Sequence, residues 1–259
     1  MTLSQNHATA AASLLAACSF AATPASQMTA KTYTSPEGQT IAYRIHVPPA
    51  ATNGNARVPL VLFFHGAGER GNDNAAQLIH GVPAILDFIA EGHPAILIAP
   101  QCPAGMMWVD TPWHLMSHTM SQTPSRTMQA VIGILDREQA ALPVDTARVY
   151  VTGISMGGYG TWDLLQRFPE RFAAAMPVCG GGDTNLAARL VNIPIHAVHG
   201  GSDGVVPVFR SRSMVEGTRA AGGKQVTYVE HEGAGHNVWT RTYADRQNLE
   251  WLFNQKKAR

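Results

Sequence analysis

Charged side chains, cysteines and long apolar runs are all scarce in this sequence. Charged residues make up 14% of its 259 residues, where an average soluble protein has about a quarter. The formal net charge is +1 and no basic run is present, which argues against nucleic acid as a partner. The body of the chain has no apolar stretch of 18 or more residues, so no membrane-spanning helix is expected.

The three cysteines, Cys18, Cys102 and Cys179, match no metal-binding spacing, so a metal site is not expected. Cys102 and Cys179 each follow a predicted strand, which should bring both to the same edge of a parallel sheet. Two outcomes fit this placement equally well, a disulfide in an exported protein or two buried free thiols.

Residues 1–27 differ in composition from the rest of the chain. Residues 8–25 are rich in Ala and Ser around an apolar centre, like the h-region of a secretory signal, although no Lys or Arg precedes it. Leu15-Ala-Ala-Cys18 resembles a lipobox, which would make Cys18 a lipid anchor, and cleavage near Ala25 is the alternative. The pattern favours export over a cytoplasmic tail, followed by one catalytic domain over residues 28–259.

That domain alternates apolar strands with helices, without an internal repeat or a linker. A strand over 40–47 alternates as an exposed edge strand should, and continuous apolar runs predict strands buried on both faces. The alternation predicts an α/β fold with a mostly parallel, doubly wound sheet and helices on both faces. Strands are expected over 58–64, 93–100, 148–154, 172–178, 193–199 and 225–230, and helices over 83–91, 125–142, 159–168, 207–221 and 240–253.

The sequence Gly153-Ile-Ser-Met-Gly157 stands between a predicted strand and a predicted helix. This context is typical of a nucleophile elbow, in which a strained turn exposes a serine hydroxyl. The tight turn crowds the positions two before and two after the serine, which explains the glycines. Ser155 is therefore the candidate nucleophile.

A serine nucleophile needs a base, and histidine suits that role near neutral pH. His236 follows the last strand in a glycine-rich loop that can bring the ring over the sheet edge, while its nearest rival, His231, lies at the strand end. His65 and His199 also end strands, and we expect their rings to bond loop backbone instead.

A carboxylate must fix the tautomer of that base. Asp203 follows the penultimate strand and is the preferred acid. Asp183 follows the strand before it, where it suits a helix N-cap better. The resulting order, Ser155 then Asp203 then His236, is that of α/β-hydrolases.

Acyl transfer also needs donors for an oxyanion. The backbone N–H of Met156, just after the serine, is one candidate. The second should come from the loop after strand 58–64, where Ala67 is preferred and Gly66 and Gly68 are alternatives.

Together these motifs resemble one group of α/β-hydrolase esterases, related to polyhydroxybutyrate depolymerases and to feruloyl and acetyl-xylan esterases. Members of this group are often described as predicted peptidases of the prolyl oligopeptidase type. The resemblance covers roughly residues 30–255 and implies a serine hydrolase without metal or cofactor, with Ser155, Asp203 and His236 as its triad. It rests on His65-Gly-Ala-Gly-Glu-Arg-Gly71, Pro100-Gln-Cys-Pro103 with Trp108, Gly153-Ile-Ser-Met-Gly-Gly-Tyr-Gly160, Asp203-Gly-Val-Val-Pro207 and His236-Asn-Val-Trp239.

The chain has neither a propeller domain nor a long cap insertion. Residues 69–81 and 101–124 are the candidate covers, so an open site is expected that accepts small-molecule or polymer-borne esters. Trp108 and Trp239 are candidate substrate contacts, with plain packing as the equal alternative.

Three functions fit these residues. The leading hypothesis is a carboxylic ester hydrolase that works through an acyl-enzyme. A serine peptidase is the second, because the same triad cleaves amides. The third is a non-catalytic relative that only binds a ligand, against which the complete triad argues.

Overall fold

The computed structural model describes residues 23–53 and 56–257. The predicted signal segment, including Cys18, falls almost entirely outside these ranges. Its last residues form α1 (Pro24–Gln27), which the side chain of Thr23 caps. Arg44 donates hydrogen bonds to the carbonyls of Ala25 and Met28 at 3.2 and 3.0 Å. Residues 24–27, which precede the expected domain start at residue 28, are therefore hydrogen-bonded to the residues that follow it.

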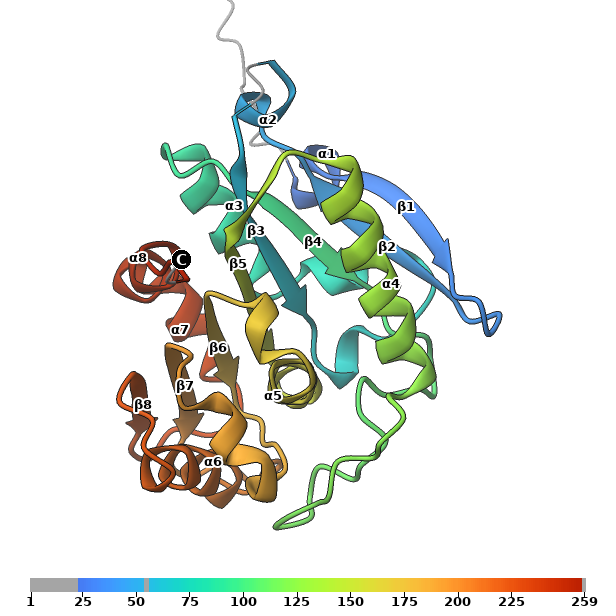
Figure 1. The fold of residues 1–259 in the computed structure, drawn as a ribbon. Coiled ribbons are helices and arrows are strands. Elements are labelled where there is room, and N and C mark those ends of the chain that lie inside the picture. Colours follow the sequence, from blue (N-terminus) through green and yellow to red (C-terminus); the bar gives the residue numbers. More distant parts are fainter. Residues whose placement is uncertain (1–22, 54–55, 258–259) are drawn as a thin grey trace, which may run out of the picture.

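One eight-stranded sheet forms the centre of the molecule (Figure 1), in the order β1-β2-β4-β3-β5-β6-β7-β8. β1 and β2 pair antiparallel, as do β2 and β4, and the other neighbours pair parallel. Parallel strands joined by helical crossovers give an α/β-hydrolase fold, as predicted. The strands are β1 (Thr29–Thr34), β2 (Thr40–His46), β3 (Val58–Phe64), β4 (Ile96–Pro100), β5 (Val144–Ile154), β6 (Ala174–Val178), β7 (Ile195–Gly200) and β8 (Val226–His231).

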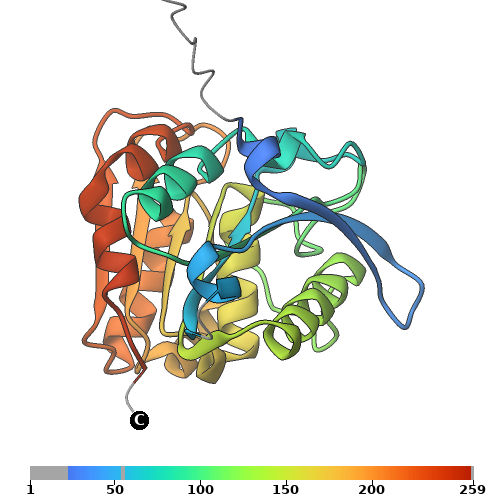
Figure 2. The same ribbon diagram turned by 90° about the horizontal axis from the view of Figure 1, so that it is seen from above.

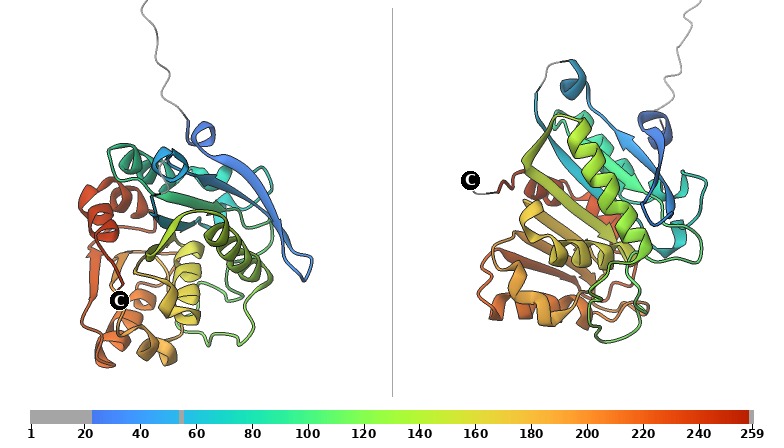
Figure 3. Two further views of the ribbon diagram at one scale, coloured as in Figure 1. Left: turned by 45° about the horizontal axis from the view of Figure 1, so that its top comes forward. Right: turned by 45° about the vertical axis from the view of Figure 1, so that its right-hand side comes forward.

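Helices cover both faces of the sheet (Figures 2 and 3). One core lies under α4 (Arg126–Ala141), α5 (Met156–Arg167) and α6 (Phe209–Ala220). The other lies under α3 (Val82–Ala90), α7 (Trp239–Ala244) and α8 (Arg246–Phe253). The short α2 (Pro49–Asn53) precedes β3. No helix of the described residues is long and apolar enough to cross a membrane.

Three expectations about the elements need correction. The edge strand is β1, because β2 lies between β1 and β4 and its alternation reflects one buried face. The expected closing helix is two helices, because Asp245 adopts an extended conformation and its side chain caps α8. Helix α5 begins at Met156 rather than near Tyr159, since the Ser155 carbonyl already accepts a hydrogen bond from the Tyr159 N–H.

Candidate active site

Ser155 stands in the sharp turn between β5 and α5. It has φ 54° and ψ −119°, a conformation that costs energy for any residue with a side chain. A Cβ atom added to Gly157 would lie 2.1 Å from the carbonyl oxygen of Phe64. A Cβ atom added to Gly153 would lie 2.5 Å from the carbonyl oxygen of Gly157. The two glycines therefore let α5 start against the ends of β3 and β5. Ser155 itself is 9% exposed.

The structure brings the three predicted side chains together from three separate strand ends. His236 Nε2 lies 2.8 Å from Ser155 Oγ, and His236 Nδ1 lies 2.6 Å from Asp203 Oδ2. An ionised carboxylate accepts a hydrogen bond but cannot donate one, so Nδ1 carries the proton. Nε2 is then free to accept the serine proton.

Asp203 stays ionised although its side chain is fully buried. Its Oδ1 accepts hydrogen bonds from the backbone N–H groups of Val205 and Val206, both at 2.9 Å. Burial pushes the pKa of the Asp203 carboxyl upward, but hydrogen bonds from His199, His236 and these amides outweigh it and hold that pKa well below its usual range. Donors around a carboxylate favour its charged form.

His199 was expected to bond loop backbone, and it does so through Val206 O, 3.1 Å from its Nε2. The same nitrogen also lies 3.1 Å from Asp203 Oδ2. This second contact was not predicted from the sequence. The signal available for it was the four-residue separation of His199 and Asp203 across a turn at the end of a buried strand.

The two predicted oxyanion donors each stand at the start of a helix. Met156 is the first residue of α5, and Ala67 is the first residue of a 3₁₀ helix, Ala67–Glu69, in the loop after β3. The first residue of a helix has no acceptor for its N–H within that helix. No other acceptor in the described residues takes either N–H, so both remain available to a ligand.

His65 ties the loops after β3 and β4 together. Its Nδ1 donates to Gly66 O at 2.6 Å, and its Nε2 accepts from the Cys102 N–H at 2.9 Å. Burial lowers the pKa of His65 to about 4, so the ring is neutral near neutral pH. This backbone role is the one predicted for His65.

Trp108 is not a substrate contact. Its side chain is fully buried, packs edge-on against Phe64, and donates its indole N–H to the His65 carbonyl at 3.1 Å. A buried indole that meets a backbone acceptor is a packing residue, so the packing alternative holds here.

Trp239, in contrast, borders the site. It is half-buried, and its ring lies edge-on to the His236 imidazole, with 5.0 Å between centroids. The His80 ring lies 5.9 Å from the Trp239 ring on the other side. Glu69 Oε1 lies 3.7 Å from His80 Nε2. His236, Trp239, His80 and Glu69 thus form a continuous series of contacts that starts at the histidine next to Ser155, which we call the histidine-side arc.

The rival candidates lie outside this arrangement. The carbonyl of His231 accepts a hydrogen bond from the Gly201 N–H, and the side chain makes no contact with Asp203 or Ser155. Asp183 caps the 3₁₀ helix Thr184–Leu190, as expected of an N-cap, and also accepts the Met120 N–H at 2.9 Å.

The irregular segment between β4 and α4, one of the two expected covers, is held to the neighbouring helices (Figure 1). The Tyr159 hydroxyl donates to Trp113 O at 2.8 Å. The Arg167 guanidinium donates to Ser121 O at 2.8 Å. Residues Leu115 and Met116 within this segment are 42% and 53% exposed. The segment thus packs on α5, the helix that begins directly after Ser155.

Cys102 and Cys179 are buried free thiols, which decides the alternative left open by the sequence. Cys179 has φ 50°, and its Sγ donates to His236 O at 3.3 Å. Its sulfur and the side-chain ligand atoms of Asp203 and His236 lie within 4.8 Å of one another. Burial and the nearby Asp203 raise the pKa of the Cys179 thiol, and Asp203 and His236 already bind each other, so this group is poorly suited to a metal ion.

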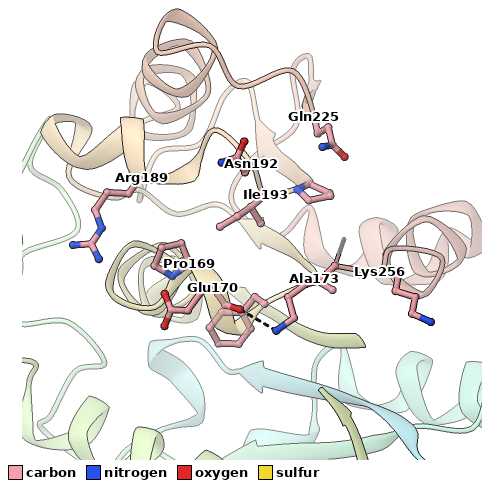
Figure 4. Close-up of a pocket in the computed structure, with 11 residues that line it drawn as sticks. Pro169, Glu170, Ala173, Arg189, Asn192, Ile193, Gln225 and Lys256 are labelled. Atoms are coloured by element: carbon pink, nitrogen blue, oxygen red, sulfur yellow. Dashed lines mark hydrogen bonds between the residues drawn. The ribbon is translucent and has the colours of Figure 1, made fainter. Parts of the chain in front are cut away.

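A cavity of about 680 Å³ lies elsewhere (Figure 4). Ala173, Pro194 and Gln225, which line it, directly precede β6, β7 and β8. The cavity therefore opens at the amino ends of these strands. In parallel α/β sheets the reactive site lies at the carboxyl ends, where Ser155 stands.

Comparison with known proteins agrees with the α/β-hydrolase fold. Residues 50–249 match the sequence pattern of the phospholipase/carboxylesterase family. The chain belongs to this family. The crystal structure of a thermostable esterase is 38% identical, covers 89% of this chain and 64% of its own chain, and superposes with a TM-score of 0.81. A ferulic acid esterase structure at 17% identity covers 87% of this chain and 97% of its own, with a TM-score of 0.65, a likeness of fold alone.

Curated relatives of this phospholipase/carboxylesterase family member are much longer. An uncharacterized secreted protein of Arthroderma benhamiae is 25% identical over 85% of this chain and 27% of its own length. A bifunctional acetylxylan esterase/xylanase of Neocallimastix patriciarum is 26% identical over 62% of this chain and 22% of its own length. The chain thus spans about a quarter of each. These similarities support an ester hydrolase of the α/β-hydrolase superfamily.

Proposed function

We propose that the protein is a serine hydrolase that cleaves carboxylic esters through an acyl-enzyme. The observation that carries this proposal is the unbroken hydrogen-bond chain from Ser155 Oγ through His236 to Asp203, at 2.8 and 2.6 Å. A hydroxyl, a base and a carboxylate in this order activate a serine at neutral pH.

In the first half-reaction, Ser155 Oγ attacks the ester carbonyl carbon while its proton passes to His236 Nε2. The carbonyl oxygen becomes an oxyanion, which the N–H groups of Ala67 and Met156 stabilise. Each such donor is worth about 3 kcal/mol. The carbon–oxygen bond to the alcohol then breaks, and His236 returns the proton to the leaving oxygen.

In the second half-reaction, water attacks the acyl-enzyme and gives its proton to His236. The carboxylic acid leaves, and Ser155 regains its proton. Asp203 remains ionised throughout and stabilises the imidazolium that forms twice in each cycle.

The surroundings of the site support an exposed ester as substrate. Val205 and Phe209, which follow Asp203, are each 46% exposed, and the segment around Met116 adds further exposed apolar surface. Apolar side chains beside an open site suit esters of small molecules or of polymers. The secreted relative of Arthroderma benhamiae supports export, with the cytoplasm as the alternative.

A panel of p-nitrophenyl esters, feruloyl esters and peptide anilides separates the candidate functions. We expect short esters to be cleaved faster than anilides, and Ser155→Ala to abolish both reactions. Faster turnover of anilides would replace the esterase with a peptidase. No turnover of any substrate by well-folded protein would favour the non-catalytic alternative.

A further inference from the structure

His199 is the next-to-last residue of β7 and is fully buried under α6. Its Nδ1 lies 2.7 Å from Ser211 Oγ. Its Nε2 lies 3.1 Å from Asp203 Oδ2 and 3.1 Å from Val206 O. Every polar atom of this buried ring therefore has a partner, and two of the partners belong to the loop that carries the acid.

The partners fix the position of the proton on the ring. Val206 O and the ionised Asp203 only accept hydrogen bonds, so His199 Nε2 carries a proton. The Ser211 hydroxyl then either donates to Nδ1, or accepts from it and donates to Gly180 O, 3.0 Å away. In both arrangements Nε2–H lies between Val206 O, which accepts its hydrogen bond, and Asp203 Oδ2, which is 3.1 Å from the nitrogen.

We propose that His199 is a positioning residue that holds Asp203 in the orientation in which Oδ2 meets His236. This inference rests on the proposed function of Ser155, Asp203 and His236. Oδ1 is held by the Val205 and Val206 amides, whereas His199 contacts Oδ2, the oxygen that meets His236. Its contact with Val206 O joins the loop to the same ring.

Removal of the His199 donor has two expected effects. Asp203 loses a restraint, so kcat falls by roughly ten- to a hundredfold, as for loss of one hydrogen bond to a charged group. KM stays unchanged because His199 does not touch the substrate. Without the His199 proton nearby, Asp203 Oδ2 also attracts the His236 imidazolium more strongly, which favours the protonated form of His236 in the free enzyme. The acid limb, the part of the pH profile in which kcat/KM falls as His236 becomes protonated, should therefore move to higher pH by about one unit.

The test compares His199→Phe, which has no donor, with His199→Gln, whose amide N–H can replace Nε2–H. We expect the Phe variant to have a lower kcat and an acid limb of kcat/KM at higher pH. In the Gln variant the acid limb should return to its wild-type position. His196→Gln is the matched control, because His196 lies on the same strand and bonds Thr227 instead. If His199→Phe does not fold, Ser211→Ala removes only the Nδ1 partner and should shift the limb less.

Other titratable groups near this pair stay constant in the comparison. They are Cys179 at the end of β6, Tyr159 on α5, Arg210 on α6 and Glu230 on β8. An unshifted acid limb in His199→Phe would overturn the proposal, as would equal losses in the Phe and Gln variants. Unchanged kcat in His199→Phe would do so as well.

A separate observation concerns Glu69 in the oxyanion loop. A Cβ on Gly66 would lie 3.0 Å from Glu69 Oε2 and 3.6 Å from Ser155 Cβ, so both groups border the same point. The Glu69 side chain is 12% exposed, and its nearest charged or titratable partners are His80 at 3.7 Å and His65 at 4.0 Å. No hydrogen bond to protein occupies this carboxylate in the described residues.

The position of Glu69 relates it to the alcohol rather than to the acyl group. His236 must give its proton to the leaving oxygen, so the alcohol departs beside His236. Trp239, His80 and Glu69 continue from His236 along the histidine-side arc. We infer that Glu69 sets the specificity for the alcohol part of the ester, favouring a cationic group there and disfavouring an anionic one.

Two acetate esters of equal shape test this inference, which also rests on the proposed function. Acetylcholine, the acetate ester of choline, carries a cation, and 3,3-dimethylbutyl acetate is its neutral isostere. A carboxylate within several ångströms should raise kcat/KM for the cation roughly fivefold over the neutral ester. Glu69→Gln should bring that ratio close to one, while Glu91→Gln, a half-exposed site at the end of α3, keeps it.

The outcomes separate the two proposals. A ratio that is unchanged in Glu69→Gln contradicts the role of Glu69 alone. Absence of turnover of both esters by the wild-type protein contradicts the proposed function.

Discussion

At the residue scale, the site combines a strained serine with a carboxylate that is buried and still ionised. Ser155 is held at φ 54° by the close packing around its glycines, and Asp203 is held ionised by four donors. A folded protein tolerates such groups where the surrounding structure fixes them. Both features serve the histidine between them.

The assignment of the base is tested by substituting the two neighbouring histidines separately. His236→Ala should lower kcat for p-nitrophenyl acetate by at least about a thousandfold, because nothing else can take the serine proton. His231→Ala should keep most activity, since its side chain makes no contact with Ser155 or Asp203. The reverse pattern of initial rates would show that the base had been misassigned.

At the element scale, the site depends on how closely α5 approaches the ends of β3 and β5. Gly157→Ala should unfold the elbow or displace α5, because its Cβ would lie 2.1 Å from backbone oxygen. We expect a loss of at least about 3 kcal/mol in the free energy of unfolding, measured by chemical denaturation.

Gly204→Ala is the matched control for that measurement, because a Cβ there meets no atom within 4 Å. Its denaturation midpoint should equal that of the wild type. A Gly157→Ala protein as stable as this control would refute the steric account of the elbow.

His65 makes the link between the loops after β3 and β4 sensitive to pH. Burial lowers its pKa to about 4, against about 6.5 in an unfolded chain. Between these values the unfolded chain binds more protons, so the stability that is complete above pH 6.5 decreases as the pH falls and levels off below pH 4. From pH 7 to 4.5 this group alone should cost about 2 kcal/mol.

Denaturant unfolding at pH 7 and 4.5 measures this loss. His65→Gln keeps a donor and an acceptor but does not titrate, so its unfolding free energy should fall less over the same interval. Equal decreases in the two proteins would mean that His65 does not carry the effect. The partly buried His118, with a pKa also near 4, contributes equally to both.

Most elements could be predicted because buried strands are apolar and helices have a clear period. The helix over 125–142 is an example, with Ser125 as its cap. The break at Asp245 could not be predicted in the same way, because a capping aspartate also occurs on the exposed face of an unbroken helix. The start of α5 was misplaced because glycines at 157 and 158 oppose a helix unless close packing requires them.

At the scale of the whole molecule, strand order is what assembles the site. Ser155, Asp203 and His236 are far apart in sequence, and the carboxyl ends of β5, β7 and β8 bring them to one edge of the sheet. The type and order of these residues could be read from the chain. Two other features could not be predicted from the sequence: the contact between His199 and Asp203, and the burial of Trp108. They depend on loop paths and packing rather than on a repeating pattern.

The most direct test of the central claim is the intact mass of the protein after treatment with a fluorophosphonate, followed by peptide mapping. An activated serine forms one stable adduct, whereas an inert one does not react. The account predicts a single adduct on the peptide that contains Ser155, and none on Ser155→Ala. Wild-type protein that is folded but unlabelled, or labelled only at another residue, would contradict it.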